Sequence, residues 1–299
     1  MELRHLRYFV AVAEAGSLTE AAEHRLFTSQ PSLSRQIRDL EDEIGSPLLM
    51  RSARGVELTP AGRAFLDHAR VALSQVDAAV EAARRAAQPS KPILALGFLT
   101  GTEMTWLPKA MQVLRDDLQT IDVTVSSDYS PDLADALARG KLDAAFLRAE
   151  TGFGLEYRVV HREPLVVLMP SDHPLTQQER VRPEDFSGEL FVATSNKATV
   201  LREVTEAYLE RARIDASREH GVDNLAMAMS LVASTRGFAL MPAYATNLLP
   251  WSVVSRPLDG EVPTIDLTVG YSKTNASPVL KRFLSRLDEL ADDGHARVI

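Results

Sequence analysis

Residues 28–45 read TSQPSLSRQIRDLEDEIG, and this stretch decides the fold of the first part of the chain. Apolar side chains recur in it at i, i+4, i+7 and i+11, the periodicity of a helix with one buried face. These are Leu33, Ile37, Leu40 and Ile44. Thr28 is expected to cap the helix, Pro31 suits its first turn, and Gly45 ends it. The stretch therefore predicts an amphipathic helix.

Two features indicate that a partner contacts the polar face of this helix. A shorter helix precedes it, since an apolar periodicity from Leu3 to Gly16 is followed by a capping-box pattern, Ser17 and Glu20. Two short helices joined by a tight connection are what a helix-turn-helix requires. The side chains that suit base edges and phosphates are Gln30, Ser34, Arg35 and Arg38. The alternative is an ordinary solvated helix face.

A hairpin is expected next, over residues 47–58, with its turn at 53–55. Arg51 flanks the turn and Arg54 lies at its tip, so both cations would meet the backbone or the minor groove of DNA. Residues 1–60 hence predict an all-α winged helix-turn-helix that binds double-stranded operator DNA. Overall charge cannot supply the affinity for DNA, because this segment has seven Arg, no Lys and nine acidic residues, within a chain of net charge −8. The affinity must therefore come from arginines at specific positions.

A long helix is predicted over residues 60–88. Its apolar residues alternate spacings of four and three, which is the period of a coiled-coil seam. The seam consists of Phe65, Ala69, Ala72, Val76, Ala79, Ala83 and Ala86. We expect it to mediate dimerisation, the alternative being packing against the chain's own core. Residues 89–92 then form a hinge between domains.

Six short motifs together resemble those of LysR-type transcriptional regulators. They are residues 1–9 (MELRHLRYF), 16–22 (GSLTEAA), 29–37 (SQPSLSRQI), 40–41 (LE), 47–49 (PLL) and 58–62 (LTPAG). The opening and residues 28–41 are most similar to regulators of aromatic-acid catabolism, such as the activator of phenylpropionate dioxygenase. The resemblance implies DNA contacts from Gln30, Pro31, Ser34, Arg35 and Arg54.

The same resemblance implies the organisation of the remaining chain. It implies an effector domain with a periplasmic-binding-protein-like fold of two Rossmann-like subdomains, residues 93–162 with 267–299, and residues 163–266. A small inducer would bind in the cleft between them. It also implies a homotetramer, a dimer of dimers assembled through residues 60–88 and the effector domains. Contact with RNA polymerase is a further expectation.

From Ile93 onward, the pattern itself predicts an α/β fold with largely parallel sheets. Strands are expected at 93–98, 121–126, 142–147, 165–169, 190–193, 238–241 and 265–271. Helices are expected at 105–118, 131–139, 200–212, 225–234 and 279–290.

Three strand-to-helix turns are candidates for the effector site. At Thr100, Gly101 and Thr102, hydroxyls and free N–H groups could hold a carboxylate at a helix N-terminus. Ser130 begins the second turn, where a helix cap is the alternative role. The third turn comprises Thr194, Ser195 and Asn196. In aromatic-acid-responsive relatives, equivalent turns line the cleft, which implies Thr100 or Gly101, Ser130 and the segment from Thr194 to Val200 here.

Arg148 follows a predicted strand, at the end where ligand sites of α/β folds gather. It could pair with an effector carboxylate, or with Glu150 or Glu163 in a structural bridge. Four apolar residues could form a floor for the ligand or be core packing alone. They are Phe98, Met104, Trp106 and Phe146.

Several functions are not supported by the sequence. The chain lacks cysteine, Gly-rich phosphate loops and the common hydrolase motifs, and its seven His have no metal-ligand spacing, so we expect no catalytic residue, cofactor or metal. No apolar run is long enough for a membrane span and no export signal is evident, which predicts a cytoplasmic protein. The alternatives are oxidant sensing through methionine, and a solute-binding protein, which the N-terminal segment argues against.

Overall fold

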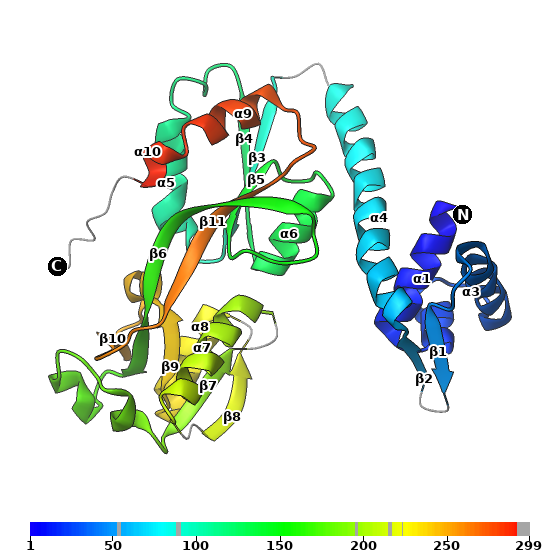
Figure 1. Cartoon of the computed structure of the whole chain (residues 1–299). Coiled ribbons are helices and arrows are strands. Elements are labelled where there is room, and N and C mark those ends of the chain that lie inside the picture. Colours follow the sequence, from blue (N-terminus) through cyan, green and yellow to red (C-terminus); the bar gives the residue numbers. More distant parts are fainter. Residues whose placement is uncertain (53–54, 88–90, 195–196, 215–216, 223, 292–299) are drawn as a thin grey trace. The chain divides into compact units, whose positions relative to one another are not determined.

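The computed structural model describes residues 1–52, 55–87, 91–194, 197–214, 217–222 and 224–291 (Figure 1). The chain folds into two compact units, an N-terminal one that ends with the long helix α4 and a C-terminal one that begins with strand β3. Among the helices described, none combines the length and the apolar content that a bilayer-spanning segment needs.

The N-terminal unit has the helices and the hairpin that the sequence predicts. Its elements are α1 (Leu3–Ala15), α2 (Leu18–Glu20), the π-helical turn η1 (Ala21–Arg25), α3 (Gln30–Ile44), β1 (Leu49–Ser52), β2 (Gly55–Leu58) and α4 (Pro60–Ala86). Gly16 and Gly45 end α1 and α3 in the left-handed conformation, with φ of 63° and 76°. Ser17 accepts from the N–H of Glu20, as expected. The cap of α3 is Ser29 and not Thr28, because Ser29 accepts from the N–H of Ser32.

The core of this unit lies where α1, α3, the hairpin and the first turns of α4 meet. Its largest fully buried side chains are Phe9, Leu33, Ile37, Leu40 and Leu48. The predicted stripe of α3 is thus buried except at its end, where Ile44 is 37% exposed because the helix runs past the core. The Phe9 and Phe65 rings meet edge to face at 5.2 Å, so the start of α4 belongs to this core.

The C-terminal unit is built around a seven-stranded sheet. Its strands are β3 (Ile93–Leu99), β4 (Asp122–Asp128), β5 (Ala144–Leu147), β6 (Leu155–Pro170), β9 (Ala239–Pro242), β10 (Val253–Pro257) and β11 (Thr264–Ser272). The order is β10-β6-β11-β5-β3-β4, with β9 paired to β6. A separate pair consists of β7 (Leu190–Thr194) and β8 (Ser217–Val222).

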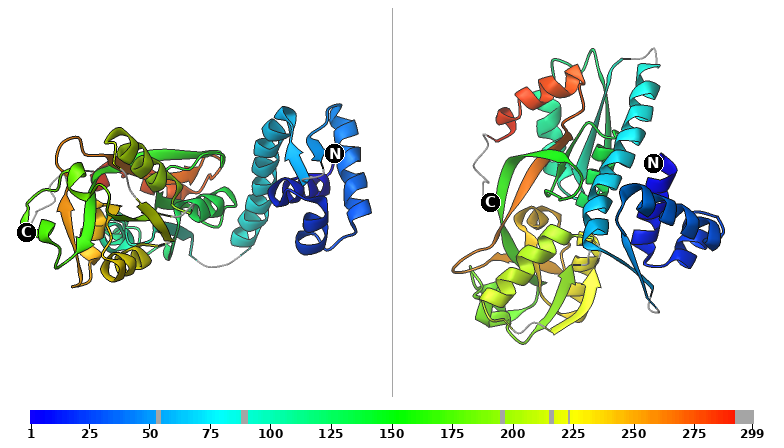
Figure 2. Two further views of the ribbon diagram at one scale, coloured as in Figure 1. Left: turned by 90° about the horizontal axis from the view of Figure 1, so that it is seen from below. Right: turned by 45° about the vertical axis from the view of Figure 1, so that its right-hand side comes forward.

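The expectation of largely parallel sheets is wrong, because the sheet is mixed. Only β3 with β4, β3 with β5, and β7 with β8 are parallel among the pairs described. All pairs made by β6 and β11 are antiparallel. Strand β11 lies beside residues 155–164 of β6, and the two strands connect the two halves of the unit (Figure 1; right-hand view of Figure 2).

Helices cover the sheet on both halves of the C-terminal unit. They are α5 (Glu103–Val113), α6 (Ser130–Ala138), α7 (Thr199–Arg211), α8 (Leu225–Thr235), α9 (Pro278–Ser285) and α10 (Asp288–Ala291). Short 3-10 turns lie at η2 (Pro174–Gln177), η3 (Pro183–Phe186) and η4 (Ala243–Leu248). Phe98, Trp106 and Phe146 form the first half's core, where the two Phe rings stack at 4.9 Å, and the second half has its own core around Phe191 and Phe238.

Candidate functional site

The N-terminal half of α3 presents the polar face that the sequence predicts. Pro31, Arg35 and Arg38 are exposed there, and Gln30 is partly exposed beside the capping residue Ser29. Gln30 and Pro31 lie at the end of the helix whose free N–H groups and dipole favour phosphate oxygens, and Arg35 and Arg38 follow further along α3. The geometry suits a helix that enters the major groove by its N-terminal end.

Ser34 does not lie on this exposed face as expected. It is 5% exposed, and its hydroxyl accepts from Nη1 of Arg51 at 2.9 Å. The Nε–H of Arg38 donates to the backbone oxygen of Ser34 at 3.3 Å. Ser34 therefore orients two arginines from beneath. Arg54, the candidate at the tip of the hairpin, lies outside the described residues.

The acidic half of α3 also differs from a uniformly solvated face. Asp39, Asp42 and Glu43 are exposed. Glu41 instead turns inward, where its Oε1 accepts from the N–H groups of Leu48 (2.8 Å) and Leu49 (3.0 Å). This carboxylate fixes the start of the hairpin to the recognition helix.

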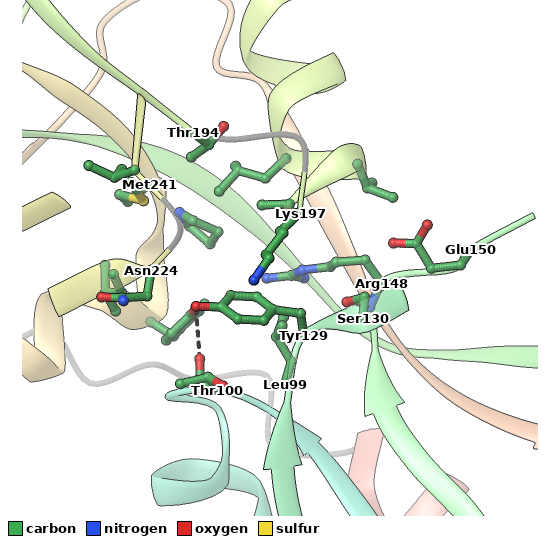
Figure 3. A pocket seen from close by; sticks show the side chains of 17 residues that line it. Leu99, Thr100, Tyr129, Ser130, Arg148, Glu150, Thr194, Lys197, Asn224 and Met241 are labelled. Carbon is green, nitrogen blue, oxygen red and sulfur yellow. Dashed lines mark hydrogen bonds between the residues drawn. The ribbon is translucent and has the colours of Figure 1, made fainter. Parts of the chain in front are cut away.

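The C-terminal unit contains a cavity between its two halves, at the ends of β3, β5, β7 and β9 (Figure 3). It encloses about 670 Å³ of space free of atoms, open solvent at its mouth included. The apolar part of its wall consists of Leu99, Ala198, Val200, Leu201, Val222, Leu225, Met241 and Pro242. The polar part consists of Thr100, Tyr129, Ser130, Arg148, Glu150, Thr194, Lys197, Asn224 and Tyr244.

Arg148 is the most constrained polar group of this wall. It is 4% exposed, and its Nη2 donates to Oε1 of Glu163 at 2.8 Å. The second oxygen of Glu163 accepts the backbone N–H of Tyr244 at 2.9 Å. Nη1 of Arg148 is buried without a hydrogen-bond partner among the described residues. Of the two possible structural bridges, the structure has the one with Glu163, and it leaves one guanidinium nitrogen unused.

Ser130 has a role other than capping. It is the first residue of α6, it is buried, and its Oγ accepts the backbone N–H of Arg148 at 3.0 Å. The hydroxyl hence fixes the end of β5, from which the guanidinium of Arg148 extends into the wall of the cavity (Figure 3).

The turn at residues 100–102 offers fewer free N–H groups to a ligand than the sequence suggests. The N–H of Thr100 donates to Asp128, that of Gly101 to the carboxylate of Glu103 at 2.7 Å, and that of Thr102 to Leu99. The expected free N–H groups are thus already used, since Glu103 of the chain itself fills the helix N-terminus. Of the three residues, only Thr100 lines the cavity.

Gly101 allows the two halves of the C-terminal unit to pack closely together. Its φ is 93°, and a Cβ there would lie 2.9 Å from the ring of Tyr244. The hydroxyl of Tyr244 donates to the backbone oxygen of Thr100 at 3.3 Å. Burial raises the pKa of Tyr244 to about 12, so the phenol stays protonated and remains a donor.

The third turn contributes to the cavity wall through the residues at its two ends. Thr194 lines the cavity, and its hydroxyl is buried without a partner among the described residues. Val200 lines it as expected, whereas Ser195 and Asn196 lie outside the described residues. Of the two roles open to the four apolar residues, Phe98, Trp106 and Phe146 have that of core packing, and Met104 is exposed.

Glu150 is a wall residue whose acidity is altered by its surroundings. Burial, and after it the charge of Glu203 on α7, raise the pKa of the Glu150 carboxyl from 4.5 to about 7. The two carboxyl groups come from opposite halves of the unit. Glu150 therefore changes its charge in the neutral pH range, within the wall that also holds Arg148 and Lys197.

Sequence reasoning missed several wall residues. They are Leu99, Tyr129, Glu150, Leu201, Val222, Asn224, Leu225, Met241, Pro242 and Tyr244, whereas Lys197 and Ala198 lie within the segment 194–200 that the resemblance implies. Asn224 caps α8 by accepting from the N–H of Met227, so a recognised strand β8 would have marked it as a fourth strand-to-helix turn. Tyr129, adjacent to the candidate Ser130, had the same signal.

Two family models match this chain. One, described as the LysR substrate binding domain, matches residues 87–292, and the other, described as a bacterial regulatory helix-turn-helix protein of the lysR family, matches residues 3–63. The chain belongs to the LysR family. It is therefore a DNA-binding transcriptional regulator with an effector-binding domain, and the relatives that it matches are regulators and not enzymes.

Relatives of this LysR-type regulator match over almost the whole chain. The Hca operon transcriptional activator HcaR of Escherichia coli (strain K12) is 36% identical over 291 residues, which are 97% of this chain and 98% of HcaR. The structure of full-length BenM is 27% identical with a TM-score of 0.57, covering 97% of this chain and 96% of that one. CbnR complexed with its target DNA shares the fold, with a TM-score of 0.57 at 24% identity over 97% and 100% of the chains.

Proposed function

We propose that a small carboxylate with an apolar, aromatic body binds in the cavity and modulates operator binding by this regulator. The observation that carries the proposal is Arg148, which lines the cavity and whose buried Nη1 has no partner among the described residues. A buried cationic donor without a partner is costly, and a carboxylate oxygen would satisfy it with a charge-assisted bond. Because Nη2 is held by Glu163, the guanidinium would bind the ligand without moving far.

The rest of the wall favours an apolar body for this ligand. Val200, Leu201, Met241 and Pro242 come from the second half of the unit and Leu99 from the first, so a flat ring would be covered from both sides. Thr194 supplies a second unsatisfied polar group, and Lys197 adds a cation to the wall. Pockets for small molecules typically combine such an apolar lining with a few polar groups that fix orientation.

The test compares two ligands of nearly the same shape, one charged and one neutral. 3-Phenylpropionate is expected to raise the melting temperature of the full chain, since a ligand at 100 times its Kd adds about 2.7 kcal/mol. Its neutral carboxamide is expected to have little effect, because the amide cannot make the ionic bond to Arg148. Equal shifts with both, or with neither across a panel of aryl and alkyl carboxylates, would exclude the carboxylate. Should oxidants alone then change DNA binding, the methionine-based alternative would replace it.

For the DNA interface, we assign contacts to Gln30, Pro31, Arg35, Arg38 and Arg51, with Ser34 positioning the last two. Arg35→Ala and Gln30→Ala are expected to abolish specific operator binding in a footprint while leaving assembly intact. Arg4→Ala, an exposed arginine of α1 paired with Glu2 at 3.3 Å, is the control. An unchanged footprint in both α3 variants would reject this assignment.

The assembly that we propose is a homotetramer, built through residues 60–88 and the effector domains. The middle of α4 supports it, because residues 71–78 are only partly buried and Val80 is 47% exposed. A helix that leaves part of an apolar seam exposed can bury it against a second copy of the helix. The domain limits proposed are 1–60, 60–88, a hinge at 89–92, and 93–299 with subdomains 93–162 plus 267–299 and 163–266. RNA polymerase is the further partner proposed.

A further inference from the structure

Phe27 is the most exposed large apolar side chain in the N-terminal unit. Its exposed fraction is 88%, against 61% for Met1 and 50% for Met50. The residue lies in the turn between η1 and α3, two positions before the capping residue Ser29. Its ring makes no contribution to the core of that unit, which Leu26 contacts instead.

The backbone at Phe27 is also unfavourable for this residue type. Its φ is 49°, in the left-handed region that L-residues with bulky side chains rarely adopt. Hydrogen bonds on both sides hold the turn there: the N–H of Leu26 donates to Ala21, and that of Thr28 donates to Ala22, both at 3.0 Å. Glycine or asparagine would form the same turn at lower cost. Folding alone therefore does not account for a phenylalanine at this position.

The position of the Phe27 side chain beside α3 accounts for the choice of a phenylalanine. Two residues span at most about 7.6 Å between Cα atoms, so Phe27 lies next to the N-terminal end of α3. That end carries Gln30, Pro31 and Arg35 on its exposed surface. A partner that covers these side chains also reaches Phe27. In this family that partner is operator DNA.

We infer that Phe27 contacts operator DNA, packing its ring against the apolar surface that DNA exposes in and beside the major groove. That surface comes from two sources, the C5-methyl group of thymine and the carbon face of deoxyribose. Burial of the ring on binding would compensate both for its exposure in the free protein and for its backbone strain. Phe27 thereby adds an apolar contact to the polar ones of α3.

The test separates DNA binding from folding, because the same substitution should raise the melting temperature and weaken DNA binding. Phe27→Asn in the full chain should raise the melting temperature, by about 2 °C, because asparagine tolerates the left-handed conformation. The same variant should weaken binding to a duplex selected from random DNA with the wild-type chain, by about fivefold. Phe27→Leu, which keeps an apolar side chain, should lose less than about twofold. Arg213→Asn is the control, because Arg213 has a φ of 54° in the C-terminal unit and should gain stability without a change in DNA affinity.

Two further duplexes distinguish the sources of the contact. With thymine as the source, replacing thymine by uracil in the selected duplex should weaken the wild type and leave Phe27→Asn unaffected. With deoxyribose as the source, Phe27→Asn should lose equally on a scrambled duplex. Either result supports the inference. If Phe27→Asn binds every duplex with unchanged affinity, the inference is overturned. This holds also if the variant has a different oligomeric state, because the ring would then belong to a contact between copies of the chain.

Discussion

Arg148 and Glu163 form a buried ion pair in which each partner has a second task. The guanidinium lines the cavity, and the carboxylate accepts the N–H of Tyr244 through its other oxygen. Both side chains are about 5% exposed or less, so neither charge has water to replace a lost partner. The pair therefore links the wall of the effector cavity to the stability of the fold.

Glu163→Gln is expected to destabilise the chain by about 3 kcal/mol, because it leaves the Arg148 charge buried without compensation. Chemical denaturation with two spectroscopic probes measures the loss. The matched control is Asp266→Asn, which removes the carboxylate from the exposed pair that Asp266 forms with Arg162 at 2.6 Å and 2.9 Å. This substitution should change stability little, since exposed pairs are screened by water. Equal effects of the two substitutions would contradict the importance of burial here.

Thr194→Val should leave stability unchanged or raise it by up to ~1 kcal/mol, because it removes a buried hydroxyl that has no partner among the described residues. If that hydroxyl binds the inducer, the affinity for a carboxylate that stabilises the wild type should fall about fivefold to tenfold in calorimetry. Thr205→Val is the control, because Thr205 on α7 has an equally unpartnered hydroxyl and does not line the cavity. Parallel losses of ligand affinity in both variants would point to an indirect effect.

Glu150 predicts a pH dependence. Its pKa in the folded chain is about 7 against an ordinary 4.5, so the folded state favours the protonated form. The contribution of this group to stability is therefore fully present below about pH 4.5 and is lost as the pH rises to about 7. In Glu150→Gln, the loss of stability that this group causes between pH 5 and pH 8 should be absent, as followed by thermal denaturation.

The same group should affect ligand binding. A carboxylate ligand stays ionised above about pH 5, whereas Glu150 gains its charge near pH 7, so affinity should fall as the pH rises through 7. The other charged and titratable groups of the wall are Tyr129, Arg148, Lys197 and Tyr244, and the charge of Glu203 on α7 acts on Glu150 as well. Titration calorimetry at pH 6 and pH 8 measures the effect, and a dependence that persists in Glu150→Gln would assign it to another of these groups.

Val76→Glu tests the seam of α4. A carboxylate in an apolar seam between helices is costly, so the variant should lose its dimer at concentrations at which the wild type is assembled. Ala82→Glu, off the seam and on an exposed part of the same helix, should assemble like the wild type. Light scattering after size exclusion gives both masses. Assembly of Val76→Glu like the wild type would favour the effector domains as the main interface.

The sequence predicts elements well where periodicity and burial coincide. The α3 stripe and the turns at Gly16 and Gly45 follow from apolar spacing and from glycine at left-handed positions. The cap of α3 does not follow, because Thr28 and Ser29 are adjacent hydroxyl residues and only the backbone geometry selects Ser29. The inward turn of Glu41 was equally unreadable, since its partners are backbone N–H groups of another element.

The candidate site was predictable to a similar extent. Thr100, Arg148 and Thr194 follow strands with clear apolar runs, and all three line the cavity. Strand β8 reads SREHGV, without the apolar alternation of a half-buried strand, so the turn that holds Asn224 went unnoticed. The first part of β6 was also missed, although Leu155, Tyr157 and Val159 alternate there with polar residues and so carry the pattern of a half-buried strand. Tyr244 and Glu150 belong to the wall only because the two halves of the unit approach one another, which no local pattern expresses.

At Gly101 the two halves of the C-terminal unit already touch so closely that a single methyl group would not fit beside Tyr244. This part of the C-terminal unit has no room for a larger residue at position 101 unless the Tyr244 ring moves. A substitution at Gly101, which is not a lining residue, would accordingly reach the ligand site through Tyr244, which is one.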